Sequence, residues 1–76
     1  MPVDDLIDDV SRETLRAWPD LATGTRTARP KAWGALAARG VTALRARLGR
    51  APTDAERRAI WSALWRGATE DPRADR

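Results

Sequence analysis

The residues with the clearest chemical potential are seven cations that fall within residues 21–50. They are Arg26, Arg29, Lys31, Arg39, Arg45, Arg47 and Arg50, and the same segment contains neither Asp nor Glu. Guanidinium and ammonium groups bind phosphate oxygens, and their clustering on one segment is a mark of nucleic-acid-binding proteins. The segment carries a charge of +7, whereas the whole chain carries +3. This distribution favours a polyanionic partner.

The chain lacks the side chains on which most catalytic and metal sites depend. It has no His, Cys or Tyr, so the commonest general base, the commonest metal ligand and any disulfide are excluded. The remaining carboxylates, hydroxyls and single lysine form no recognisable catalytic motif. We therefore expect a protein that is not an enzyme and that needs no cofactor or metal.

No targeting or membrane-spanning segment is visible in the sequence. The first ten residues, MPVDDLIDDV, are acidic where a secretory signal would be basic. No apolar run approaches the roughly 20 residues that are needed to cross a membrane. These features predict a cytoplasmic protein with no membrane partner, and they give no indication of a small-molecule substrate.

Three parts of the chain have apolar residues at every third or fourth position, the pattern of amphipathic helices. The pattern predicts an all-α fold, a small three-helix bundle that forms a single domain over residues 1–66. The helices are expected at about 3–18, 30–48 and 54–66. Gly40 lies within the second segment and either permits close approach of another helix or divides the segment in two. We favour one continuous helix.

Prolines mark the boundaries of the first two predicted helices. Pro19 is expected to end the first, because the residue before a proline resists the α conformation. Pro30 suits the first position of the second, where its missing N–H costs nothing. Residues 19–29 lack an apolar period and predict a long loop. Since it contains Arg26, Arg29 and three threonines, this loop is either a solvated connection or a phosphate-contacting segment.

The third predicted helix carries two tryptophans, Trp61 and Trp65, one turn apart. A chain this small needs efficient burial, so Trp18, Trp33 and at least one of these two are expected in the core. The other, Trp65 by its position near the helix end, is expected to remain partly exposed. An exposed tryptophan is a good anchor for a protein partner, so both are predicted partner-interface residues.

Beyond the third helix, the sequence turns polar. Gly67 is expected to end the helix. The following residues are short side chains, charges and a proline, so 67–76 is predicted to be a disordered tail.

The stretch LGRAPTDAE, residues 48–56, predicts a sharp junction between the second and third helices. Gly49 is a candidate left-handed cap, and Pro52 prevents helical continuation through the residue before it. Thr53 and Glu56 have the T-x-x-E spacing of a capping box. The connection at 49–53 is short, as in helix-turn-helix-like arrangements.

The same nine residues resemble the pattern L-G-R-x-P-T-x-x-E in the third conserved region of bacterial primary-type sigma factors. In that family the pattern joins two helices of a small three-helix domain that lies on promoter DNA. The resemblance covers nine of the 76 residues and ends after Glu56, where RRAIWSALW replaces the small apolar helix of the sigma pattern. It implies a helix-turn-helix-like shape and a DNA partner.

The leading hypothesis is therefore a small arginine-rich protein that binds nucleic acid, DNA above all, with low sequence specificity. Its predicted contact residues are Arg26, Arg29, Lys31, Arg39, Arg45, Arg50, Arg57 and Arg58. Asp54 and Glu56 would repel phosphate from the start of the third helix. The second helix is thus the better phosphate-binding element.

The alternative hypothesis is a protein-interaction module, either a homodimer or a small accessory subunit of a larger complex. It starts from the charge of residues 1–20, which is −4. This acidic helix could pair with the basic helix of another chain or cover the basic segment of its own. The two hypotheses differ in where they expect the acidic side chains to lie.

Overall fold

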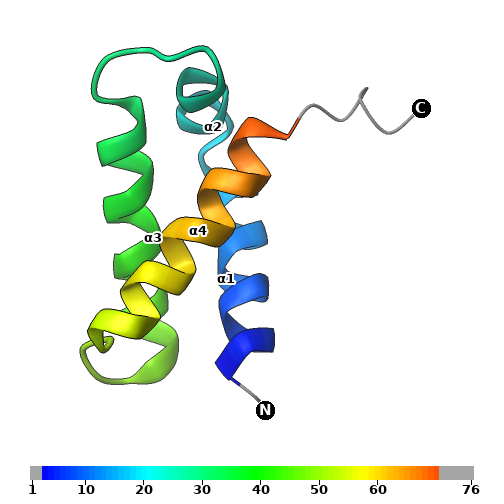
Figure 1. Cartoon of the computed structure of the whole chain (residues 1–76). Coiled ribbons are helices and arrows are strands. Elements are labelled where there is room, and N and C mark those ends of the chain that lie inside the picture. Colours follow the sequence, from blue (N-terminus) through cyan, green and yellow to red (C-terminus); the bar gives the residue numbers. More distant parts are fainter. Residues whose placement is uncertain (1–2, 71–76) are drawn as a thin grey trace.

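The computed structural model describes residues 3–70, which form four α-helices (Figure 1). The all-α fold is confirmed, but the helices number four rather than three. They are α1 (Val3–Ala17), α2 (Pro19–Arg26), α3 (Ala32–Leu48) and α4 (Asp54–Thr69). α4 crosses the molecule and packs against each of the other three helices.

The additional helix, α2, occupies most of the segment that the sequence predicted to be a loop, so that prediction is wrong for Pro19–Arg26. Pro19 ends α1 and also begins α2, because the first position of a helix needs no N–H. Asp20 lies in the first turn, where the helix dipole favours a negative charge. The Thr25 hydroxyl donates a 2.9 Å hydrogen bond to the Leu21 carbonyl, so this buried polar group is satisfied within the helix.

The connection between α2 and α3 is short and strongly bent. Two of its non-glycine residues, Ala28 and Lys31, have positive φ values of 58° and 70°. The Arg29 N–H donates a 2.8 Å hydrogen bond to the Gly24 carbonyl, which fixes the bend. Pro30 therefore lies in the connection and not at the start of α3, as the sequence had predicted.

The core lies where α1, α3 and α4 meet, and aliphatic side chains fill it. Its buried members are Ile7, Val10, Leu36, Leu44, Ile60, Ala63, Leu64 and Ala68. Trp33 only packs against this cluster, and Trp18, Trp61 and Trp65 are 39%, 37% and 48% exposed. The prediction of a core position is wrong for Trp18 and Trp61, because branched aliphatic residues already occupy the helix interfaces, whereas the predicted exposure of Trp65 is confirmed.

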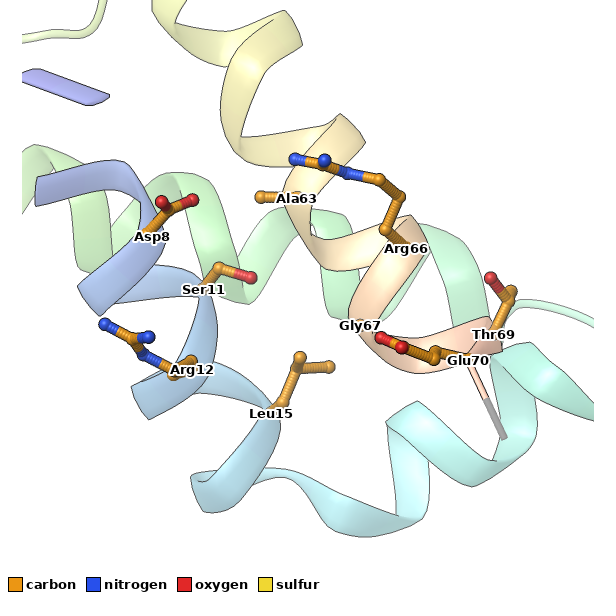
Figure 2. Close-up of a pocket in the computed structure, with 9 residues that line it drawn as sticks. All are labelled: Asp8, Ser11, Arg12, Leu15, Ala63, Arg66, Gly67, Thr69 and Glu70. Carbon is orange, nitrogen blue, oxygen red and sulfur yellow. The ribbon is translucent and has the colours of Figure 1, made fainter. Parts of the chain in front are cut away.

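Two glycines allow α4 to approach its neighbours closely. Gly40 lies inside an unbroken α3, so the prediction of a single helix is confirmed; a Cβ there would meet the Cδ1 of Leu64. Gly67 does not end α4, because it packs against Leu15 of α1 instead (Figure 2). The predicted tail is thus helical as far as Thr69, and its part at 71–76 lies outside the described residues.

The α3–α4 junction has the predicted local structure. Gly49 has a φ of 72° and caps α3, donating its N–H to the Arg45 carbonyl at 3.0 Å. The capping box is complete: the Glu56 N–H donates to Thr53 Oγ1 at 3.1 Å, and the Thr53 N–H donates to Glu56 Oε1 at 2.8 Å. The predicted glycine cap and capping box are therefore confirmed.

Candidate nucleic-acid interface

All eight predicted contact residues are exposed, and they lie on several different elements. Arg26 lies on α2, and Arg29 and Lys31 lie in the α2–α3 connection. Arg39 and Arg45 lie on α3, Arg50 lies in the α3–α4 connection, and Arg57 and Arg58 lie on α4. Within residues 3–70, six of them form no ion pair. These unpaired contact cations are Arg26, Arg29, Lys31, Arg39, Arg45 and Arg58.

The exposed face of α3 has Arg39 at one edge and Arg45 in the last turn of the helix. It is built from small side chains, Gly34, Ala38 and Thr42, spaced four residues apart. Such spacing places them on one line along the helix, so a partner can approach its backbone closely. The first turn of α3 contains no acidic residue, and the positive end of the helix dipole adds to the charge of Lys31.

Arg39 is positioned by an aromatic contact that the sequence analysis missed. Its guanidinium carbon lies 4.1 Å from the centre of the Trp18 ring, a cation–π geometry. The contact keeps the charge while limiting the freedom of a long side chain. The two residues are 21 positions apart, and only the turn at Pro19 brings them together, so no sequence spacing could have indicated the pair.

Two of the predicted cations are instead engaged by acids of the α4 N-terminus. Arg50 donates to both carboxylate oxygens of Glu56, at 2.8 and 2.9 Å, and Arg57 pairs with Asp54. Hydrogen bonds from the Arg50 guanidinium and from the Thr53 N–H lower the pKa of Glu56 to about 2. Arg50 therefore stabilises the junction, and less of its charge is available to a partner.

The Glu56 ion pair predicts a pH dependence of stability. Since folding lowers the Glu56 pKa, its ion pair stabilises the fold above the ordinary carboxyl pKa of about 4.3 and is lost as pH falls toward about 2. In Glu56→Gln, which keeps a side chain suited to the capping box, thermal stability will fall less between pH 5 and about pH 2. Thermal unfolding of both proteins across this range checks the prediction, and identical pH profiles would contradict it.

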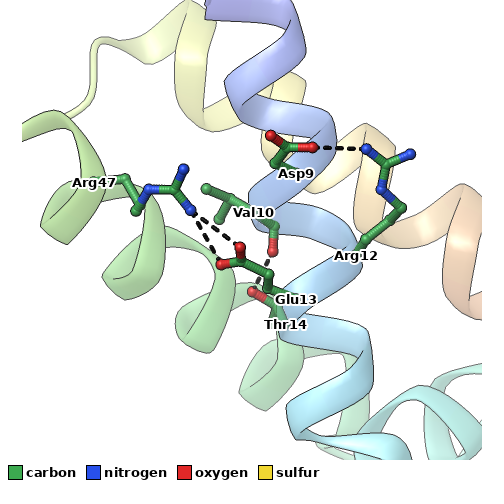
Figure 3. A network of polar contacts seen from close by, with 6 residues as sticks. All are labelled: Asp9, Val10, Arg12, Glu13, Thr14 and Arg47. Carbon is green, nitrogen blue, oxygen red and sulfur yellow. Dashed lines mark hydrogen bonds and ion pairs between the residues drawn. The ribbon is translucent and has the colours of Figure 1, made fainter.

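Within the described part of the chain, the acidic residues of α1 form no ion pair with the unpaired contact cations. Asp9 pairs with Arg12 of its own helix at 2.7 Å (Figure 3). Glu13 accepts hydrogen bonds at 3.2 Å from Arg47, which lies on α3 but is not among the predicted contacts. Arg47 is thus the one cation of the basic segment whose charge α1 offsets among residues 3–70.

A groove of about 660 Å³ lies between α1 and α4, on the acidic helix (Figure 2). Charged side chains of both signs line it, namely Asp8, Arg12, Arg66 and Glu70. Because these charges offset one another, the groove has no preference for a polyanion. The Ser11 hydroxyl points into it, but among the described residues it donates no hydrogen bond to a base that would make it a nucleophile.

A second groove, of about 460 Å³, lies between α3 and α4. One wall is the small-residue face of α3, and the other is formed by Trp61 and Arg57. Trp65 follows one turn later and makes an edge-to-face contact with Trp33, with 5.2 Å between the ring centres. The predicted interface residues Trp61 and Trp65 are therefore both accessible, and Trp61 lies beside the small residues of α3.

Comparison with family models, curated proteins and solved structures finds no match for this chain. The resemblance of residues 48–56 to the sigma-factor pattern therefore stays a prediction. Within residues 3–70, no cluster of carboxylates is arranged to hold a metal ion. The helices of the same residues are also too short or too polar to span a membrane.

Proposed function

We propose that this protein binds nucleic acid through the unpaired contact cations of α2, the α2–α3 connection, α3 and the start of α4. The observation that carries the proposal is the separation of charge: within residues 3–70, six predicted cations are exposed without ion pairs, while the two α1 acids that form ion pairs, Asp9 and Glu13, bind Arg12 and Arg47. Exposed cations of this kind contact phosphates, which supply affinity and little sequence information. Low sequence specificity follows.

Salt dependence of binding tests this proposal. Titration of labelled random-sequence DNA, double- and single-stranded, at about 50 and 200 mM salt will show binding at the lower concentration. Several phosphate contacts predict an affinity roughly 10²–10³-fold lower at about 200 mM salt. Binding releases counterions from the nucleic acid, and this release is less favourable when the salt concentration is high. Absence of binding at low salt, or an affinity that salt leaves unchanged, would rule out the function.

A second candidate function is a protein-interaction module that uses Trp61 and Trp65. The observation that favours it is their exposure, 37% and 48%, since the other large apolar side chains exposed within residues 3–70 are Val3 and Trp18. Large exposed aromatic residues are common anchors of protein interfaces. Light scattering at micromolar concentration tests the homodimer, and a monomeric mass would exclude it.

A further inference from the structure

The groove between α3 and α4 has an aromatic wall between positive ends. Arg57 and Arg58 lie one turn before Trp61 on α4, and Arg45 lies one turn beyond Val41 and Thr42 on α3. At the other end of α3 lies Lys31, followed by the Trp33–Trp65 contact. From Lys31 to Arg45 the α3 axis spans roughly 20 Å, at about 1.5 Å per residue.

Among the residues that the structure describes, none of those that line the groove is acidic. The nearest acids in sequence, Glu56 and Asp54, are already paired with Arg50 and Arg57. Gly34, Ala38 and Thr42 give the opposite wall a low profile, so a flat group can lie against the Trp61 ring without displacing a long side chain. Positive charge at the ends and a half-exposed indole between them suit a chain that alternates phosphates with planar rings.

Resting on the proposed function, we propose that single-stranded nucleic acid lies along the α3–α4 groove with a base stacked on Trp61. Single strands expose the faces of their bases, and aromatic side chains bind these faces with little regard to sequence. A duplex keeps its bases stacked on one another and offers mainly phosphates to a surface without a projecting helix. The acids Asp54 and Glu56 at the start of α4 also disfavour insertion of that helix into a duplex groove.

The stacking contact predicts a preference for single strands that depends on Trp61. Fluorescence anisotropy with an oligothymidylate of about 12 nucleotides and a duplex of equal length will show at least roughly tenfold tighter binding of the single strand. Trp61→Leu will lose about tenfold in affinity for the single strand and little for the duplex. Trp61→Phe, which keeps an aromatic face, will retain most of the affinity.

Trp18→Leu is a matched control, since Trp18 is exposed to a similar extent but contacts Arg39 on the other edge of α3. Because the lost Arg39 contact concerns phosphate binding, this variant will weaken binding of both forms alike and leave the preference for single strands in place. If Trp61→Leu does not fold, tryptophan fluorescence carries the test: oligothymidylate will quench the wild type more than Trp61→Phe.

The outcomes separate the two proposals. The stacking site is overturned, while nucleic-acid binding stands, by the following combined result. Single-stranded and duplex DNA bind with equal affinity, Trp61→Leu has no effect, and oligothymidylate quenches the wild type and Trp61→Phe equally. Failure of the wild type to bind either form at low salt overturns both. A dimer by light scattering that Trp61→Leu dissociates would assign the groove to a second copy of the chain, and so overturns the inference.

Discussion

Replacing Leu64 by alanine will lower the free energy of unfolding by about 2–5 kcal/mol, the usual cost of removing a fully buried leucine. Leu64 of α4 has no exposed surface, and its side chain packs against Gly40 of α3. A domain of 76 residues has a total stability of roughly 4–11 kcal/mol, so this one change removes a large share of it. Denaturant unfolding followed by circular dichroism measures the loss. A midpoint within experimental error of the wild type would contradict the packing described for α3 and α4.

Gly40→Ala tests the same contact from the other side. The added Cβ would meet Leu64 Cδ1 and lie 3.5 Å from Ile60 Cγ1, and neither buried side chain has solvent to move into. Alanine gains about 1 kcal/mol of helix propensity over glycine. We therefore expect Gly40→Ala to destabilise the wild type but to stabilise Leu64→Ala, with a coupling of about 1–3 kcal/mol. Additive effects would show that Gly40 and Leu64 do not touch.

The largest effect on binding is expected from charge reversal at Arg45 and Arg58. Both are exposed and form no ion pair among residues 3–70, and a hydrogen bond to a charged group is worth about 1.5–3 kcal/mol. Arg45→Glu combined with Arg58→Glu will weaken binding of single-stranded DNA by about 100-fold or more at low salt. The slope of log affinity against log salt will fall by about two. Anisotropy titrations at several salt concentrations give both quantities.

The matched control is Arg16→Glu combined with Arg66→Glu, an equal change of net charge on α1 and α4. These two arginines are also exposed and without ion pairs in the described chain, but Arg66 lines the α1–α4 groove. Affinity is expected to fall less than about fivefold, since salt screens charges that make no contact. Equal losses for the two pairs would mean that binding follows net charge alone and that the proposed face has no special role.

Signals local to the chain predicted the α3–α4 junction well. Gly49, Thr53 and Glu56 form hydrogen bonds with groups only a few residues away, so their spacing in the sequence is enough to predict the local structure. α2 was missed because its eight residues include Gly24 and two threonines, which weaken an isolated helix. Its stability depends on burying Gly24 and Thr25 against the rest of the fold. The signal that was available is Pro19 followed by Asp20, a good start for a helix as well as an end for one.

At the candidate site, the exposure of the cations was predictable from the sequence, whereas the side chains that each cation contacts were not. The absence of acids between residues 21 and 50 correctly indicated exposed cations. That Arg50 binds Glu56, or that Arg39 stacks on Trp18, depends on how helices pack. Trp18 and Trp61 were assigned to the core by size, whereas the helix interfaces are lined by aliphatic residues that fit closer contacts. The four-residue spacing of Gly34, Ala38 and Thr42 was visible, but only the position of Trp61 makes it a groove.

The packing of α4 determines the order in which this fold can be completed. Half of the buried cluster belongs to α4: Ile60, Ala63, Leu64 and Ala68. During synthesis α4 is the last of the four helices to leave the ribosome, and until then the apolar faces of α1 and α3 lack their cover. Leu15 and Gly67 must also meet across most of the described chain, a contact that costs loop entropy before it stabilises anything. Folding is thus expected to proceed as one late, cooperative step, and a nascent chain that stops short of α4 exposes the surface that chaperones and proteases recognise.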